Sequence, residues 1–263
     1  MKKYSYTKDA NSEVKTLSSK IKILGLNGSP RPYGATFKLL RIALETAKKL
    51  GAEVEELNLY EYRIEDCLGC VSDERLACRY PCVIDDDMKI IYDKILRADG
   101  VIFATPIYWF SPSGIVKRVI DRLTAFENMI RIDGKSWVEG KVAGVIAVGN
   151  DSGEIQVISL MFSILNSIGF IIPPFALAYH ARMEDVLENK SAVLDAANVG
   201  RSVFLMAKLV REFKEAWYDV SLELWLKKEL LGKVREEAEK IRRKVFNERV
   251  EVITKLMKEN ETK

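Results

Sequence analysis

Short apolar, β-branched segments alternate with segments of helical periodicity along most of the chain, and this alternation constrains the fold more than any other feature. Strand-like runs cover residues 22–26, 52–60, 101–106, 141–150 and 170–179, and helical patterns cover residues 36–51, 85–100, 111–123 and 154–169. Strands that alternate with helices form a parallel sheet with helices on both faces. We predict an α/β fold with a doubly wound five-stranded sheet in the order 2-1-3-4-5. That order places a ligand crevice at the carboxyl ends of strands 1 and 3.

The composition differs on either side of this core. Residues 1–20 are predicted to form a polar tail, residues 21–183 the sheet domain, and residues 184–263 a charged helical extension. Two apolar stripes run along the extension, formed by Val234, Ala238, Ile241 and Val245, and by Phe246, Val250, Ile253 and Met257. Such stripes need a cover, which is either the sheet domain or another subunit. We favour a subunit contact, in a homodimer or homotetramer.

The composition also excludes several classes of protein. The chain is 48% hydrophobic and 30% charged, which is typical of a folded globular protein and not of a disordered one. Its net charge of +3 gives no reason to expect nucleic acid or a membrane surface as the main partner. The first residues lack the apolar segment of a signal peptide, and no apolar run reaches the roughly 20 residues that span a bilayer. We therefore expect a cytoplasmic protein whose thiols stay reduced.

Three loops at the predicted crevice suit a phosphorylated, planar ligand. The loop "NGSPRPYGAT" offers the Ser29 and Thr36 hydroxyls, the Arg31 guanidinium and a helix N-terminus, which together can hold a phosphate. The loop "TPIYWFSPSG" carries an aromatic run that suits a planar heterocycle, and "GNDSGE" has small residues that let backbone approach the same ligand. Each of the first two loops has an alternative interpretation. The first loop could be an ordinary polar turn, and Trp109 or Phe110 of the second loop could fill the core or a subunit interface.

All 4 cysteines of the chain lie in one short stretch, "DCLGCVSDERLACRYPC", which spans residues 66–82. Four thiols in one loop of a cytosolic protein favour a metal site. Tetrahedral thiolate sites hold Zn²⁺ or an iron–sulfur cluster. The spacing C-x2-C-x7-C-x3-C departs from the paired C-x2-C knuckles of zinc ribbons. The predicted ligands are Cys67, Cys70, Cys78 and Cys82.

The motifs "GLNGSPRPYGAT", "DDDM" and "ADGVIFATPIYWFSPSGIVKRVIDR", together with the cysteine loop, resemble the NAD(P)H-dependent FMN reductase family, and most of all its iron–sulfur flavoproteins. The resemblance covers about Lys22 to His180 and implies a flavodoxin-like fold. It implies that the first loop binds the FMN phosphate, that the aromatic loop lies along the ribityl chain and isoalloxazine, and that the third loop closes the other side of the ring. The FMN-binding residues expected on this basis are Ser29, Arg31, Gly34, Ala35, Thr36, Pro106, Ile107, Tyr108, Trp109, Phe110, Asn150, Ser152 and Gly153.

The implied activity is hydride transfer from NADH or NADPH to FMN, followed by electron transfer to a flavin, quinone, metal, oxygen or protein acceptor. No catalytic side chain is predicted, because flavin chemistry needs no protein nucleophile, and the lone His180 is expected to be structural or at the surface. The family's compact motif has a third cysteine where this chain has Asp73. A [4Fe-4S] cluster, zinc or no metal therefore stay open. Two other functions also stay open: an electron-transfer flavoprotein without nicotinamide activity, and a flavin-free, zinc-binding assembly protein.

Overall fold

The computed structural model describes residues 20–213 and 215–261, so the predicted polar tail lies, apart from Lys20, outside the described residues. The strands are β1 (Lys22–Asn27), β2 (Glu53–Asn58), β3 (Gly100–Tyr108), β4 (Ser111–Pro112), β5 (Val142–Gly149) and β6 (Leu177–Ala181). Five strands form a parallel sheet in the order β2-β1-β3-β5-β6, and the short β4 pairs antiparallel with β3. Without β4, this is the predicted order 2-1-3-4-5, so the predicted fold class is confirmed.

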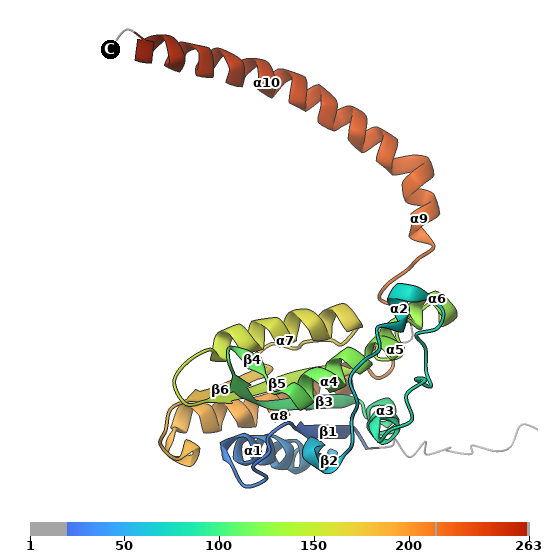
Figure 1. Ribbon diagram of the computed structural model, residues 1–263, viewed down its shortest axis with the longest axis vertical. Coiled ribbons are helices and arrows are strands. Elements are labelled where there is room, and N and C mark those ends of the chain that lie inside the picture. The colour runs from blue at the N-terminus through green and yellow to red at the C-terminus, as the bar shows by residue number, and fades with distance from the viewer. Residues whose placement is uncertain (1–19, 214, 262–263) are drawn as a thin grey trace, which may run out of the picture. The chain divides into compact units, whose positions relative to one another are not determined.

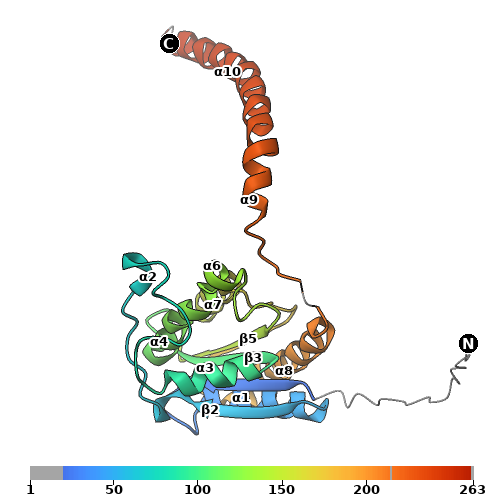
Figure 2. The ribbon, with the colours of Figure 1, turned by 90° about the vertical axis from the view of Figure 1, so that its right-hand side faces the viewer.

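Helices cover both faces of the sheet (Figures 1 and 2). The longer ones are α1 (Ala35–Lys49), α3 (Met88–Arg97), α4 (Gly114–Arg122), α7 (Glu154–Ile168) and α8 (Lys190–Val210). Short helical turns connect them: η1 (Leu59–Glu61), α2 (Cys70–Asp73), α5 (Thr124–Glu127), α6 (Ile130–Asp133) and η2 (Val186–Glu188). Helices α1 and α8 lie on one face, and α3, α4 and α7 lie on the other.

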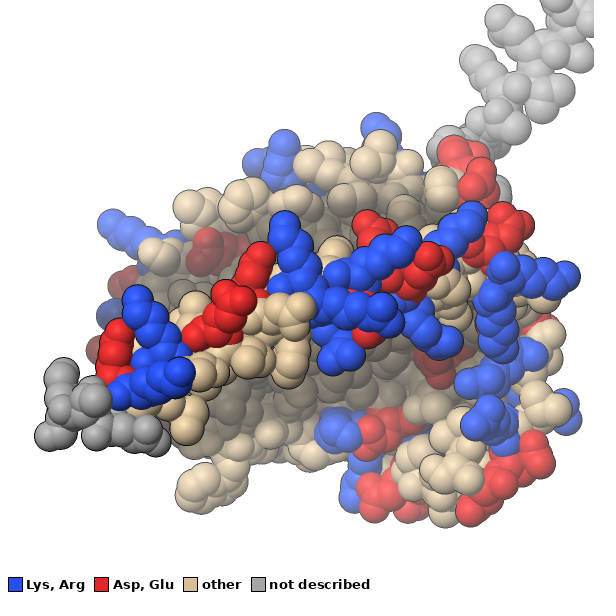
Figure 3. Space-filling model, turned by 90° about the horizontal axis from the view of Figure 1, so that it is seen from above, with Lys and Arg blue, Asp and Glu red and all other residues tan. Residues whose placement is uncertain are grey.

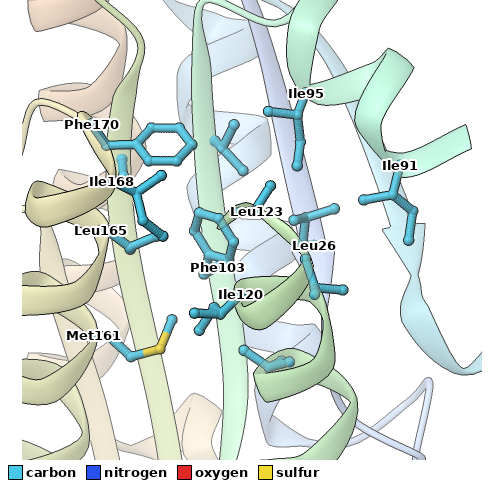
Figure 4. Close-up of a cluster of buried hydrophobic side chains, with 14 of the residues drawn as sticks. Leu26, Ile91, Ile95, Phe103, Ile120, Leu123, Met161, Leu165, Ile168 and Phe170 are labelled. Atoms are coloured by element: carbon cyan, nitrogen blue, oxygen red, sulfur yellow. The ribbon is translucent and has the colours of Figure 1, made fainter. Parts of the chain in front are cut away.

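Alternating side chains of the central strand β3 belong to two separate hydrophobic cores, one on each face of the sheet. Val101 and Phe103 pack with α3, α4 and α7, whereas Ile102 and Ala104 pack with α1 and α8. Figure 4 shows Phe103 at the centre of the first core, between Leu26 of β1 and Phe170. Successive residues of a strand point to opposite faces, so a strand covered on both sides must be apolar throughout. This explains the unbroken apolar run in the sequence.

Helix α8 belongs to the sheet domain and not to a separate extension. Its buried side chains, Ala192, Ala196, Val199 and Val203 among them, complete the second core. A Cβ at Gly200 would lie 2.0 Å from the backbone oxygen of Ala43, so only glycine allows α1 and α8 to approach this closely. The first compact unit of the chain accordingly runs to Glu215, beyond the domain boundary predicted at residue 183. The sequence predicted this segment only as part of a helical extension, because local patterns do not show which surface a helix covers.

The second unit, residues 216–263, is helical from Leu222 to Glu261. It contains α9 (Leu222–Trp225), the π-helical turn η3 (Leu226–Leu230) and the long α10 (Leu231–Glu261). Ion pairs one turn apart support α10, such as Glu236–Lys240 at 2.9 Å. Figure 3 shows basic and acidic side chains lying close to one another among the other residues. Among the described residues, no helix combines the length and the apolar character needed to cross a bilayer.

The start of α4 differs from the prediction. The helical pattern was predicted to begin at residue 111, but Ser111 and Pro112 form β4, and α4 begins at Gly114 with Ser113 at the N-cap position. The hydroxyl of Ser113 donates instead to the backbone oxygen of Gly28. The chain between β3 and α4 is therefore a hairpin followed by a helix, and this hairpin shapes the candidate site.

Candidate functional site

The loop after β1 is held by hydrogen bonds to the neighbouring strand β3 and to the residue that precedes α4. The Gly28 amide donates to the Ala104 oxygen at 2.8 Å, and the Ser113 hydroxyl donates to the Gly28 oxygen at 2.7 Å. A Cβ at Gly28 would lie 2.1 Å from Cγ2 of Val116, so a larger residue does not fit without a shift. The buried Thr105 hydroxyl accepts from the Ser113 amide at 2.9 Å and holds the same junction. Sequence reasoning missed these fastening residues, because only the sheet register brings them together.

The same loop ends in a helix start suited to an anion. The buried Ser29 hydroxyl accepts from the Arg31 amide at 3.1 Å, and Thr36 lies buried in the first turn of α1. Gly34 is the N-cap, and among the described residues no side chain caps this turn or adds a carboxylate to it. Such a turn has unpaired N–H groups and a positive dipole end, which attract phosphate. The exposed Arg31 adds a cation at the entrance.

The second loop is an aromatic hairpin with an unusual backbone. Ile107 pairs with Pro112 and Tyr108 with Ser111, so Trp109 and Phe110 form a two-residue turn. Their φ angles are +50° and +60°, as in the hairpin turn that normally takes Asn-Gly. Left-handed backbone at bulky residues is strained, and such strain collects at binding sites. The Trp109 side chain is 93% exposed, so packing within the described chain does not account for this conformation.

The third loop, after β5, touches the hairpin. A Cβ at Gly153 would lie 2.8 Å from Cδ1 of Phe110, and one at Gly149 would lie 3.1 Å from Cδ1 of Ile107. Asn150 and Ser152 lie exposed between these glycines. The structure therefore brings the three predicted loops to one edge of the sheet, at the carboxyl ends of β1, β3 and β5. The assignment of individual residues to FMN stays a prediction.

A recess that the sequence did not reveal adjoins the hairpin. It has a volume of about 620 Å³ and lies between the segment 60–66 and helix α4. Burial raises the pKa of Tyr60, and the nearby Tyr108 phenol raises it further, while Arg118 acts in the opposite direction. The recess reaches from Tyr60 to Asp66, where the cysteine loop begins.

The four cysteines line one small cavity of about 20 Å³, although they come from different parts of the loop. Cys67 is exposed and its sulfur accepts from the Gly69 amide at 3.4 Å, whereas Cys70, Cys78 and Cys82 are partly buried. Burial, followed by the charges of the other cysteines, raises the pKa of Cys78 to about 11. Within the described ranges, no three His, Cys, Asp or Glu side chains are arranged to hold a single metal ion. The lining shows that the thiols share a cavity, but they do not form a preformed zinc site.

His180 takes no part in these loops. It is buried within β6, where its Nε2 lies 3.3 Å from the backbone oxygen of Glu184 and its Nδ1 lies 3.1 Å from the Asn189 side chain. This position matches the structural role expected for a lone histidine.

A doubly wound sheet with an anion-binding turn, an aromatic hairpin and a glycine-lined loop at one edge defines a flavodoxin-like protein with a site for a phosphorylated planar cofactor. The family model for NADPH-dependent FMN reductase matches residues 21–183. The chain belongs to that family and is an FMN-dependent oxidoreductase.

Individual relatives agree with this placement. An iron-sulfur flavoprotein of Methanocaldococcus jannaschii is 35% identical over 53% of this chain and 67% of its own length. YwqN of Bacillus subtilis, named as a proposed NAD(P)H-dependent FMN-containing oxidoreductase, is 32% identical over 68% of this chain and 96% of its own. The crystal structure of RosB with a bound 8-demethyl-8-formylriboflavin-5'-phosphate intermediate has a TM-score of 0.63 and 21% identity, covering 82% of this chain and 87% of RosB. At that identity it shows the fold alone.

The residues at the sheet edge fit FMN. The uncapped first turn of α1 and Arg31 suit the phosphate, and the exposed hairpin offers flat side chains and free backbone to a ring. In addition, Nδ2 of the buried Asn27 finds no hydrogen-bond partner in the part of the chain that the structure describes. This buried donor lies next to the phosphate loop and needs a hydrogen-bond acceptor, which a ligand or a water molecule can provide.

Proposed function

We propose that this chain takes hydride from NADH or NADPH onto FMN held by the three loops, and passes the electrons to a second acceptor. The observation that carries the proposal is the strained, exposed Trp109–Phe110 hairpin beside an uncapped helix N-terminus. When bound, FMN accepts two electrons as hydride and can release them one at a time.

The side chains of this protein bind and orient the cofactor in this proposal. Ser29, Thr36 and the α1 amides hold the phosphate, and Arg31 pairs with its charge. Tyr108, Trp109 and Phe110 flank the ring, while Asn150, Ser152 and Gly153 approach it from the other side. A bidentate or charge-assisted contact from Arg31 adds both affinity and orientation.

Cofactor retention tests the phosphate assignment. Arg31→Ala removes a charged hydrogen-bond donor, whose loss costs about 1.5–3 kcal/mol, so FMN affinity should fall about 10- to 100-fold. Lys49→Ala is the matched control, because Lys49 is an exposed cation at the other end of α1. Flavin that stays fully bound to Arg31→Ala after dialysis would refute the assignment.

Nicotinamide activity separates the reductase from the electron-transfer alternative. Anaerobic addition of NADPH or NADH to the FMN-loaded protein should bleach the flavin absorption band. A flavin that only an artificial reductant reduces would favour an electron carrier, and a protein that never binds flavin would favour the assembly protein.

We further propose that the cysteine loop holds a [4Fe-4S] cluster. Support comes from the four thiols around one cavity and from the Gly69 amide that donates to Cys67. Backbone hydrogen bonds to the sulfur atoms stabilise a thiolate cluster. Iron, sulfide and zinc analysis on anaerobically purified protein, with its spectrum, decides among cluster, zinc and no metal.

We also propose that the chain is a homodimer or homotetramer. From Ile155 to Tyr179 the sequence contains no Asp, Glu, Lys or Arg, although 30% of the whole chain is charged. This stretch forms α7 and most of β6 and leaves Ile155, Leu160 and Phe175 exposed. Charge depletion with exposed aromatic and aliphatic side chains is typical of interface cores. Sedimentation equilibrium would show a monomer if the proposal is wrong.

A further inference from the structure

The two ends of the cysteine-bearing segment are tied to each other. The Arg63 amide donates to Oδ2 of Asp87 at 2.8 Å, and the Asp87 amide donates back to the Arg63 oxygen at 3.0 Å. Closer to the cysteines, the Glu65 amide donates to Oδ2 of Asp86 at 2.8 Å. Residues 66–85, with all four cysteines, therefore form a loop whose base is closed by hydrogen bonds.

A buried ion pair connects this base to helix α4. Nη1 and Nη2 of Arg122 lie 2.7 and 3.1 Å from the two carboxylate oxygens of Asp86, and Nη1 also donates to the Glu65 oxygen at 3.1 Å. The two side chains are 1% and 0% exposed. Burial alone would raise the pKa of Asp86, but hydrogen bonds from Arg122 and from backbone amides hold it below its ordinary value. The pair therefore stays charged at neutral pH.

Other contacts join the middle of the loop to the same region. Nδ2 of the buried Asn128 donates to the backbone oxygens of Arg75 and Cys78, at 2.6 and 2.7 Å. Tyr80 packs against Phe126 and Trp137, with ring centroids 5.7 and 5.3 Å apart. Both anchors follow α4 closely in the chain, so the loop is attached to the α4–α6 region at its base and at its middle.

Helix α4 also contacts the loops at the sheet edge. Ser113, at its N-cap, binds the Gly28 oxygen, whereas Arg122, its last residue, binds the base of the cysteine loop. The 9 residues of α4 span about 13 Å. One short helix thus touches both the candidate flavin loops and the cysteine loop.

We propose that Arg122, through its ion pair with Asp86, is the positioning residue of the cysteine loop, and that α4 fixes the separation between this loop and the flavin loops. The second half of the proposal rests on the proposed flavin function, but the first half does not. Arg122 suits this role because its planar guanidinium binds a carboxylate and a carbonyl oxygen at the same time, which a lysine cannot reproduce.

The variant that tests the role must keep the protein folded. Removing one member of a buried pair leaves an uncompensated charge and is strongly destabilising, whereas neutralising both members is often tolerated. The double variant Arg122→Met/Asp86→Asn removes the attachment to α4. It leaves one amide oxygen at residue 86, which can accept from one of the Glu65 and Met88 amides that now bind the two oxygens of Asp86.

Arg118→Met is the matched control. Arg118 lies one turn earlier on α4 and pairs with Asp66 at 2.6 Å, also at the base of the loop. This pair is largely exposed, with side-chain exposures of 47% and 79%, and exposed pairs contribute little. Comparing the two variants distinguishes the effect of losing the buried ion pair from the effect of removing any positive charge from α4.

The readout is the labelling rate of each cysteine by a thiol reagent, resolved by mass spectrometry. Each protein is tested as isolated and after treatment with a chelator, so that protection by a bound metal is measured separately. We expect Cys70, Cys78 and Cys82 of the chelator-treated double variant to react at least about tenfold faster, which corresponds to about 1.4 kcal/mol in loop opening. The exposed Cys67 should change little, and Arg118→Met should match the parent protein.

Further measurements on the same samples distinguish a positioning role from general weakening. The midpoint of urea unfolding should shift little in the double variant, while Arg122→Lys should label at an intermediate rate because it keeps the charge alone. Unchanged labelling of the double variant, or an equal increase in Arg118→Met, would overturn the proposal. FMN content and nicotinamide-dependent bleaching are recorded separately, so a failure of the reductase proposal is seen independently of the thiol rates.

Discussion

Replacing Trp109 by asparagine should make the FMN-free protein more stable and its FMN binding weaker. Trp109 has a φ of +50°, and left-handed backbone costs a residue with a large side chain roughly 1–2 kcal/mol, whereas asparagine tolerates it. Because the Trp109 side chain is 93% exposed, its removal sacrifices little buried area. The free energy of unfolding should therefore rise by about 1 kcal/mol.

The loss of binding follows from the role of the hairpin. An aromatic side chain that packs against a ring contributes about 0.5–1.5 kcal/mol beyond buried area, so FMN affinity should fall about three- to tenfold. Urea denaturation of the FMN-free protein measures the first effect. Titration of FMN fluorescence measures the second.

Phe175→Asn is the control for strain without a ligand. Phe175 is another exposed aromatic residue with positive φ, at +58°, but it precedes β6 and lies away from the carboxyl ends of the strands. This variant should keep full FMN affinity, and it should gain similar stability unless Phe175 is covered in the proposed subunit contact. If Trp109→Asn does not stabilise the protein, the hairpin stores no strain, and if its FMN affinity is unchanged, Trp109 is not at the flavin.

Three further predictions concern the scaffold. Burial lowers the pKa of Lys141 to about 8 from the ordinary 10.5, against the opposing charge of Asp99. The unfolded chain therefore binds more protons between these values, so the free energy of unfolding should rise with pH across that interval, and Lys141→Met should flatten the rise. Gly28→Ala places a methyl group 2.1 Å from Val116 Cγ2 and should cost about 1–3 kcal/mol in urea unfolding. A chain ending at Glu215 should keep its FMN and its unfolding midpoint, because the first compact unit ends there. If the shortened protein is unfolded or lacks flavin, then α9 and α10 are needed for the folding of that unit.

Much of the sheet domain could be predicted from sequence. The strands read as apolar runs, and the helices as amphipathic repeats, because both patterns depend on residues only a few positions apart. Ser29, Arg31 and Thr36 could be placed at the crevice because every parallel strand ends at the same edge. α8 was predicted only as part of a helical extension, because periodicity gives the apolar face of a helix and not the surface that it meets.

The sequence by itself determined the order of the strands, the loops at their ends and the gathering of all four cysteines in one segment. Only the tertiary structure decided how those loops are held. Ser113 reaches Gly28 across 85 positions of the chain, and Arg122 reaches Asp86 across 36. Local propensity cannot specify such pairs, because they form only after the sheet register and the packing of α4 bring the residues together. The left-handed backbone at Trp109 and Phe110 has the same origin, since pairing of β4 with β3 imposes a turn that their own preferences oppose.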